Sequence, residues 1–504
     1  MSKSSAFIFS LCLYLGLTQP SLATYNVKIK PSEPYAYPEL PDVSQYNKEF
    51  FYEHLDKWSD KAEIALERLP EQHLIRRYRL ITNIHALSKA QGGLPKVLVV
   101  SDGLATLQDI SNAFPNALVQ SNENGVDTYT AKFPILIKGD AALLISEGKE
   151  LRLSEERRTF LVGGGEFFVL SGTVKSWREK TQTPSTWTGN KKDFRPFYTG
   201  WNGSRTYFYN STFESLGYNN IKAYGITITS SYLSKEELKL MPWIRGNKAT
   251  GVLMKNKFID MYYGFYCYKA QDIVILENEY IKNVVYGIDP HDYSDRLIIA
   301  KNRTWGTLIK HGIIISREVN NSFIFDNVSY NNNRSGIMLD RTSLNNVIAR
   351  NTAYHNGGDG LTIQESDLNL VWDNIFYDNK QHGINVRNSQ HVRLYDNTVF
   401  GNLGAGIYGH INELREHTHR DLELDPFTTK VSIDVRGGKL LANSGGAINV
   451  RDFEYAKIAE VMLGENGDVP GKPFKGDLSP YNREILNSHR KNHYLKLSKT
   501  IEEE

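Results

Sequence analysis

The segment Asp289-Pro290-His291-Asp292 combines residue types that can move a proton. An imidazole titrates near neutral pH, and a neighbouring carboxylate can orient the ring and raise its basicity. Proline fixes its own φ and removes a hydrogen-bond donor, so it interrupts a regular strand where a shaped site is needed. An ordinary Asp-Pro turn is the alternative interpretation. However, the segment lies in phase with a sequence repeat and replaces one of its strands, so His291 is a candidate general base.

Histidine, arginine and carboxylate residues recur at matching positions of this repeat. Because successive strand residues point to opposite faces, these positions are expected to share one outward face. The candidate site residues on this face are Tyr286, Asp289, His291, Asp292, His311, Arg317, Asp340, Arg341, His382, Arg387 and His410. The alternative is that arginine and aspartate form structural ion pairs, such as Arg341 with Asp340. An ordinary solvated face would instead carry Lys, Glu, Thr and Ser, so the composition favours a binding surface.

A long face with stacked cations suits a linear polyanion such as a polyuronate, because arginine binds carboxylates bidentately. In each uronate the hydrogen on C5 lies α to the carboxylate and is weakly acidic. An arginine facing that carboxylate would stabilise the anion that forms as the proton leaves. A nearby histidine or tyrosine would take the proton. His291 and Arg317 lie on adjacent repeats, close enough in principle to share this step.

Several reactions remain open at this point. Return of a proton to the opposite ring face gives the C5 epimer, whereas expulsion of the 4-O substituent gives a lyase product. Hydrolysis needs two carboxylates beside the glycosidic bond, and Asp289, Asp292 and Asp340 leave that alternative open, although the cationic face favours carboxylate chemistry. A non-catalytic polysaccharide-binding scaffold is a further alternative. No zinc-like ligand spacing and no repeated calcium-type loop occurs, so no metal or cofactor is expected.

A repeat of about 24 residues must position these side chains. Short β-branched runs punctuated by Asn and Gly fill each period, and the recurrent leucines of leucine-rich repeats are missing. The pattern predicts an all-β, right-handed parallel β-helix with three strands per coil. Stacked asparagines are expected to hydrogen-bond between coils. The repeated residues are Gly264, Gly287, Gly312, Gly336, Gly360, Gly383 and Gly406, with Asn256, Asn278, Asn302, Asn327, Asn351, Asn374 and Asn397 in register.

An open solenoid must cover its ends. We expect an N-terminal capping region at 24–127, partly helical, with helical spacing of apolar residues at 47–89. The β-helix catalytic domain is expected at 128–455, with a charged insertion near 412–428. A C-terminal cap or tail at 456–504 is expected to include a helix around 481–497. The apolar residues that indicate the N-terminal helix are Ile64, Leu66, Leu69 and Leu74.

Residues 1–23 are typical of a signal peptide, with Lys3 before an apolar run and Ser21-Leu22-Ala23 at the expected cleavage site after Ala23. The apolar run is too short to span a bilayer, and no later stretch approaches a membrane span. Of the two cysteines, Cys12 leaves with this segment, so no intramolecular disulfide is expected, and Cys267 is interpreted as a buried small hydrophobe. A formal net charge of +2 disfavours a globally basic nucleic-acid binder.

Three segments resemble the periplasmic mannuronan C5-epimerases of bacterial alginate biosynthesis. They are Tyr286–Asp292, His311–Glu318 and Val386–Asn388. The likeness runs through roughly residues 200–410 and more weakly to both ends. It implies a polymer-level isomerase that converts β-D-mannuronate to α-L-guluronate in alginate during biosynthesis and export. It also implies a periplasmic location and participation in an envelope-spanning secretion complex that shields the nascent polymer from a lyase.

The resemblance further assigns roles to individual residues. His291 matches the base, Arg317 matches the residue that neutralises the substrate carboxylate, and Asp289 and Asp292 complete the motif. The chain departs from the expected pattern at Tyr293, where relatives are expected to carry a basic residue. The proton donor on the other ring face stays open between water and Tyr286.

Overall fold

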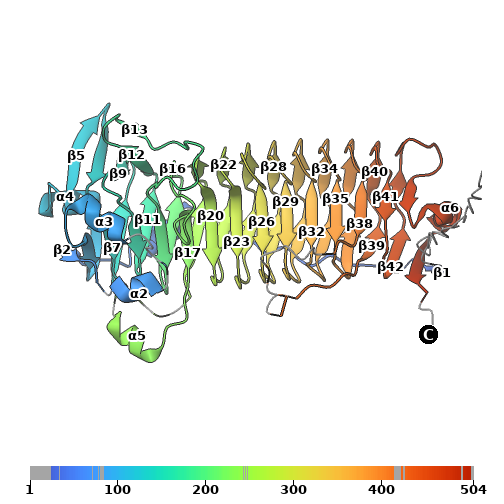
Figure 1. Ribbon diagram of the computed structural model, residues 1–504, viewed down its shortest axis with the longest axis horizontal. Helices are drawn as coiled ribbons and strands as arrows, with labels where there is room; N and C mark the ends of the chain where they lie inside the picture. Colours follow the sequence, from blue (N-terminus) through green and yellow to red (C-terminus); the bar gives the residue numbers. More distant parts are fainter. Residues whose placement is uncertain are drawn as a thin grey trace, which may run out of the picture.

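The chain folds into an elongated right-handed parallel β-helix, shown in Figure 1. The computed structural model describes residues 24–32, 34–70, 72–77, 79, 84–241, 243–244, 246, 248–413, 420, 422–423, 426–489 and 492–500. The expected signal peptide at 1–23 lies outside the described residues. Three sheets of 15 strands each run along the molecule, and each coil contributes one strand to each sheet. The predicted fold class is therefore confirmed.

Sheet 1 carries the candidate site residues on its outer side. Its strands, in spatial order, are β2 (Glu63–Arg68), β3 (Lys96–Ser101), β7 (Ile135–Ile137), β10 (Leu161–Gly163), β14 (Tyr198–Trp201), β17 (Gly225–Thr229), β20 (Tyr263–Tyr268), β23 (Tyr286–His291), β26 (Ile313–Ser316), β29 (Ile337–Asp340), β32 (Leu361–Gln364), β35 (Ile384–Arg387), β38 (Ile407–His410), β41 (Ile448–Val450) and β44 (Phe474–Gly476). All neighbours pair in parallel except β2 with β3.

Sheet 2 has a strand from each end of the described chain, β1 and β45, side by side at one edge. Its strands are β1 (Tyr25–Pro31), β45 (His493–Lys499), β42 (Tyr455–Ala459), β39 (Ser432–Arg436), β36 (Val392–Tyr395), β33 (Leu370–Trp372), β30 (Val347–Ala349), β27 (Phe323–Phe325), β24 (Ile298–Ala300), β21 (Val274–Leu276), β18 (Thr250–Met254), β15 (Arg205–Tyr209), β11 (Glu166–Leu170), β8 (Ala141–Ile145) and β4 (Gly103–Thr106). The antiparallel β45 joins β42 to β1.

Sheet 3 completes each coil before the chain returns to sheet 1. Its strands are β43 (Met462–Leu463), β40 (Lys439–Leu441), β37 (Thr398–Phe400), β34 (Ile375–Tyr377), β31 (Thr352–Tyr354), β28 (Val328–Tyr330), β25 (Arg303–Trp305), β22 (Glu279–Ile281), β19 (Lys257–Ile259), β16 (Thr212–Glu214), β12 (Thr173–Arg178), β9 (Lys149–Ser154), β6 (Val126–Ala131) and β5 (Leu118–Glu123), with β13 (Thr183–Pro184) beside β12.

The repeat places one glycine-anchored strand in each coil of sheet 1. The apolar residue after each anchor glycine is buried inside the helix; these residues are Ile288, Ile313, Ile337, Leu361, Ile384 and Ile407. The register also stacks the outward residues as expected, in the order His291, Ser316, Asp340, Gln364, Arg387 and His410. Residues separated by more than a hundred positions in sequence therefore form one straight row.

Buried asparagines lock successive coils together. Each backbone N–H of the series from Asn256 to Asn374 donates to the side-chain oxygen of the next asparagine, over 2.8–3.1 Å. Their side-chain amides donate to main-chain carbonyls of the neighbouring coil. Since a buried polar group without a partner is costly, these ladders keep the coil register in place. The predicted structural role of the asparagines is confirmed.

The helical elements are short. They are α1 (Lys48–Leu55), α2 (Gln72–Arg77), α3 (Ile84–Gln91), α4 (Leu107–Ala113), α5 (Lys235–Leu240), the 3₁₀ turn η1 (Ser479–Tyr481) and α6 (Asn482–His489). The expected helix across 47–89 is interrupted, because Ile64 and Leu66 lie in β2 and pack on the core at the two-residue spacing of a strand. The expected helix at 481–497 ends at His489, and the residues from His493 onward form β45.

The β-helix is longer than the segment expected at 128–455. Parallel stacking starts with β3 and β7 and continues to β44. Between β38 and β39 lies the expected insertion, of which the described residues 411–413, 420, 422–423 and 426–431 form no helix or strand. Within the described part of the chain, no helix is long and apolar enough to cross a membrane.

The N-terminal strap, defined as residues 35–58, covers the outer side of sheet 2. Its aromatic and apolar side chains pack on strands from β8 to β36, and the Tyr37 ring stacks on Trp372 at a centroid distance of 4.4 Å. The Tyr35 hydroxyl donates to Asp396 over 2.6 Å. The strap leads from β1 at one end of the solenoid to β2 at the other (Figure 1). Sheet 2 is thereby covered by the strap, whereas α2 and α3 cover sheet 1 only at its first strands.

Candidate active site

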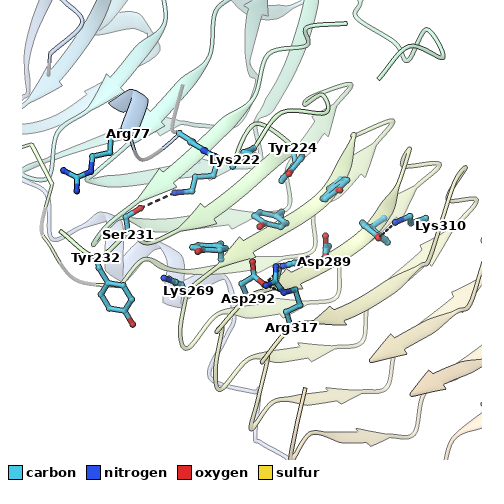
Figure 2. A pocket seen from close by; sticks show the side chains of 17 residues that line it. Arg77, Lys222, Tyr224, Ser231, Tyr232, Lys269, Asp289, Asp292, Lys310 and Arg317 are labelled. Atoms are coloured by element: carbon cyan, nitrogen blue, oxygen red, sulfur yellow. Dashed lines mark hydrogen bonds and ion pairs between the residues drawn. The ribbon is translucent and has the colours of Figure 1, made fainter. Parts of the chain in front are cut away.

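A cavity of about 800 Å³ opens on the outer face of sheet 1, where β20, β23 and β26 lie side by side. Figure 2 shows its lining. The candidate residues that line it are Tyr286, Asp289, His291, Asp292 and Arg317. Further cationic and tyrosine residues complete the wall, namely Arg77, Arg79, Lys222, Tyr224, Tyr232, Tyr263, Tyr266, Tyr268, Lys269 and Lys310. The cavity is therefore strongly polar and carries a surplus of cations.

His291, Asp292 and Arg317 meet at one point of this cavity. The Asp292 Oδ1 atom lies 3.1 Å from His291 Nδ1 and 3.1 Å from Arg317 Nε. Figure 2 shows Asp292 and Arg317 side by side. His291 ends β23, and Asp292 and Arg317 follow their strands at the corner of adjacent coils, where positive φ angles turn the chain. One carboxylate thus lies between an imidazole and a guanidinium from two coils.

Asp292 lies beside Nδ1 of His291 at ion-pair distance, although the two atoms do not have the geometry of a hydrogen bond. A carboxylate beside Nδ1 favours the tautomer that carries its proton there, and Nε2 is then free to accept a proton. Burial alone would lower the pKa of His291, but the nearby carboxylates of Asp292 and Asp289 outweigh it, so the pKa lies above its usual value. The side chain remains 25% exposed, so a ligand in the cavity can reach it.

Asp289 lies two residues before His291 on the same face of β23. It is only 1% exposed, and its Oδ1 atom is buried without a hydrogen-bond partner. Burial raises the pKa of this carboxyl to about 7, against the opposing influence of His291 and Lys310. Because buried polar atoms normally have a hydrogen-bond partner, this oxygen on the cavity wall is a candidate contact for a bound ligand.

Tyr286 and His311 form a second pair at the other end of β23. The Lys310 ammonium donates a hydrogen bond to the Tyr286 hydroxyl over 2.9 Å, and the Tyr286 ring stacks on His311. Burial lowers the pKa of His311 to about 3, with Lys310 and Arg334 adding to the effect. Its Nδ1 atom accepts the Ser335 N–H over 3.1 Å. His311 is thus a neutral support beneath Tyr286 and is not among the residues that line the cavity.

The other candidate residues lie farther along the same face, outside the cavity. Asp340 and Arg341 approach within 3.8 Å, the ion pair considered from the sequence. Asp340 Oδ1 and Arg387 Nε are buried without hydrogen-bond partners. The rings of His382, Tyr408 and His410 form one stack, and burial lowers the pKa of both histidines. The row predicted from the sequence therefore exists, but it divides into a cavity and a distal part.

Several cavity residues are not evident from the repeat. Lys222 comes from the enlarged coil before β17, donates to Ser231 over 3.2 Å, and has a pKa that burial lowers to about 8. No periodic signal marks that loop. Tyr266 and Tyr268 could have been found, because they pair with Asp289 and His291 in the coil register. Cys267 between them is buried, as expected, and burial raises the pKa of its thiol to about 12.

Residues 217–413 match the family described as "Periplasmic copper-binding protein (NosD)". Among the described residues, however, no group of three or more His, Cys, Asp or Glu could hold a metal ion. The Pseudomonas aeruginosa protein named mannuronan C5-epimerase is 44% identical over 441 residues, which are 86% of this chain and 79% of that protein.

Other relatives extend the match over more of the chain. The mannuronan C5-epimerase of Pseudomonas putida is 40% identical over 468 residues, covering 92% of this chain and 88% of the relative. The Azotobacter vinelandii protein named mannuronan C5-epimerase AlgG is 42% identical over 94% of this chain and 88% of its own length. A crystal structure described as the periplasmic alginate epimerase AlgG superposes with a TM-score of 0.78 at 38% identity, covering 86% of this chain and all of that one.

Proposed function

Since this chain belongs to the mannuronan C5-epimerase family, we propose that the cavity beside β23 is where it inverts C5 of the sugar. The protein is an isomerase that acts on alginate and converts mannuronate to guluronate units. The observation that carries the assignment of residues is the contact of Asp292 with both His291 and Arg317. It brings an imidazole and a guanidinium from two coils together, and we propose that both act on the same sugar.

His291 is the base in this proposal. Its Nε2 atom takes the proton from C5, and the electron pair of the broken C–H bond moves into the carboxylate to give an enediolate-like anion. Arg317 faces that carboxylate and stabilises the charge that develops on it. The cationic residues along the outer face of sheet 1 hold neighbouring carboxylates of the polymer, which runs along the solenoid.

A proton must then return to C5 from the opposite face of the ring. Water can supply it, and so can the Tyr286 hydroxyl, which accepts a hydrogen bond from Lys310 and so keeps its own proton available. Delivery to C5 completes the epimerisation. Loss of the 4-O substituent from the same anion would give the unsaturated chain end of a lyase, and the family relationship argues for the first outcome.

Asp289 has a separate role in this proposal. As a protonated acid it donates a hydrogen bond to the substrate carboxylate, beside the charge supplied by Arg317. Its burial, its unpartnered oxygen and its raised pKa are the support for this role. A carboxylic acid kept neutral in a desolvated site is an effective donor to a developing anion.

The pH dependence of the reaction should report the ionisation of both His291 and Asp289. Because the pKa of His291 is raised, the imidazole stays protonated to higher pH, and kcat/KM should fall on the acid side at a pH above the ordinary histidine value. Loss of the Asp289 proton at about pH 7 should reduce the rate on the basic side. Initial rates on poly-mannuronate should thus give a narrow bell whose two limbs belong to the coupled pair. A flat profile across this range would contradict the assignment.

Asp289→Asn and Asp289→Ala should differ strongly. The amide of the Asn variant still donates a hydrogen bond, so its activity should stay within about tenfold of the wild type and its basic limb should disappear. The Ala variant lacks the donor and should lose on the order of a hundredfold or more in kcat. Initial rates over a pH series for both variants test this. An inactive Asn variant that keeps its fold would mean that Asp289 acts in its ionised form.

The function itself is tested by proton NMR of poly-mannuronate incubated with the protein in deuterated water. Guluronate signals with deuterium at C5 support epimerisation. Ultraviolet absorbance from unsaturated chain ends would indicate a lyase, and an unchanged polymer would indicate a binding scaffold.

We also propose that the protein works in the periplasm during alginate biosynthesis and export. The solved relative is described as periplasmic, and residues 1–23 have the composition of a signal peptide. On export, cleavage after Ala23 would leave a chain that starts at Thr24, which mass spectrometry of the exported protein can check. A secretion complex is the proposed setting, and co-purification from the periplasm is its test.

A further inference from the structure

A buried ion pair connects the face of sheet 1 to the segment between β38 and β39. The Arg420 Nη1 atom donates to the Glu365 carboxylate, and the two side chains are each only 5% exposed. The residues are 55 positions apart in sequence. The pair therefore ties a non-repeating part of the chain to a coil that precedes it.

Glu365 occupies a corner position that carries arginine in the two preceding coils. It follows β32 at the corner where Arg317 follows β26 and Arg341 follows β29. At one coil per ~4.8 Å, it lies roughly 10 Å beyond Arg317 along the solenoid. Its charge acts on Asp340 and Arg387, which belong to the same face. Glu365 is thus a carboxylate on the proposed path of a polyanion.

Arg420 also contacts two residues that follow it in the sequence, Pro426 and Phe427. A second guanidinium nitrogen, Nη2, donates to the Pro426 carbonyl over 3.0 Å, and the guanidinium lies 5.5 Å from the Phe427 ring centroid. These contacts come from its own segment, while the ion pair reaches across to Glu365. Removing one partner of a buried ion pair leaves an uncompensated charge, which is costly and changes the local field.

We propose that Arg420 is a positioning residue that joins Pro426 and Phe427 to Glu365 on the face of sheet 1 and cancels the charge of that carboxylate on the path of the polymer. This inference rests on the proposed function. Without Arg420, the Glu365 carboxylate would repel the uronate carboxylates that pass two coils from the reacting sugar. The effect acts on binding of the substrate and not on the proton transfer at His291.

Arg420→Met, Glu365→Gln and the double variant form the test, in a double-mutant cycle. Arg420→Met should raise KM for long poly-mannuronate about tenfold with kcat nearly unchanged, because it alters ground-state and transition-state binding alike. Adding Glu365→Gln removes the repelling charge and should restore KM to within about twofold of the wild type. The increase in KM should shrink at high salt, because salt screens the repulsion between Glu365 and the carboxylates of the solvated polymer.

Arg178→Met is the matched control, because Arg178 pairs with Glu155 at 2.9 Å on β12 of sheet 3, away from the face of sheet 1. It should leave KM unchanged. Arg420 would have a purely structural role if Arg420→Met raised KM equally in the Glu365→Gln background. The same conclusion would follow if Arg420→Met lowered kcat and the melting temperature together at constant KM. Either result overturns the proposal.

The proposed function is judged separately by wild-type turnover. If the wild type incorporated no deuterium at C5, the epimerase assignment of the cavity would fail, whatever the variants did. Affinity for poly-mannuronate, measured by titration calorimetry, would still report the coupling of Glu365 with Arg420.

Discussion

Replacing His291 with alanine should abolish epimerisation and leave the fold intact. The side chain lies on the outer face of sheet 1, so its loss opens no cavity in the buried core. A general base typically contributes 10²- to 10⁴-fold to the rate, and turnover should fall by about that factor. Proton NMR of poly-mannuronate measures the loss, and circular dichroism with thermal unfolding checks the fold.

His355→Ala is the control for this variant. His355 also lies beside a carboxylate, 3.6 Å from Asp378, but at the end of a sheet 3 strand. Its replacement should leave turnover unchanged. If the His291→Ala protein still placed deuterium at C5 at the wild-type rate, another residue would have to be the base.

Replacing Arg317 with leucine should stop turnover through kcat. The guanidinium is the cation closest to the His291–Asp292 pair, and its loss leaves the charge on the substrate carboxylate without a partner in the transition state. Removing one such electrostatic group costs on the order of 10²- to 10³-fold in kcat. Arg317→Lys, which keeps the charge and loses the bidentate geometry, should recover part of the activity.

Steady-state kinetics separate this role from simple binding. Arg350→Leu, which removes a guanidinium paired with Asp326 after β30 of sheet 2, is the control and should behave as the wild type. If Arg317→Leu weakened only the affinity for the polymer and left kcat unchanged, Arg317 would hold the substrate without neutralising the reacting group.

The alignment of the site residues in one row could be predicted because it depends only on the number of residues per coil. One glycine and one asparagine per coil fix the number of residues between equivalent positions, so His291 and Arg317 had to lie in adjacent coils. The same count placed Asp340, Arg387 and His410 in line. The distances between side chains, and the contact of Asp292 with both partners, required coordinates because they depend on rotamers at the coil corner.

Residues outside the repeat could not be placed by the number of residues per coil. Lys222 and Arg420 come from segments without a period, so nothing in the sequence relates them to a coil. The apolar residues Ile64, Leu66 and Leu69 predict a helix, but Ile64 and Leu66 also suit the two-residue spacing of a strand, and the structure places both in β2. Its pairing with β3 decides between them, and that partner lies about thirty residues away.

The position of β1 has a consequence for how the molecule is made. This strand, Tyr25–Pro31, pairs with β45, His493–Lys499, although the two strands lie far apart in the sequence. Contacts between residues so far apart in sequence slow folding, because the whole intervening chain must be ordered before the two ends can meet. A chain that lacks β45 would leave β1 without a neighbour and expose the edge of β42, where a strand of another molecule could pair.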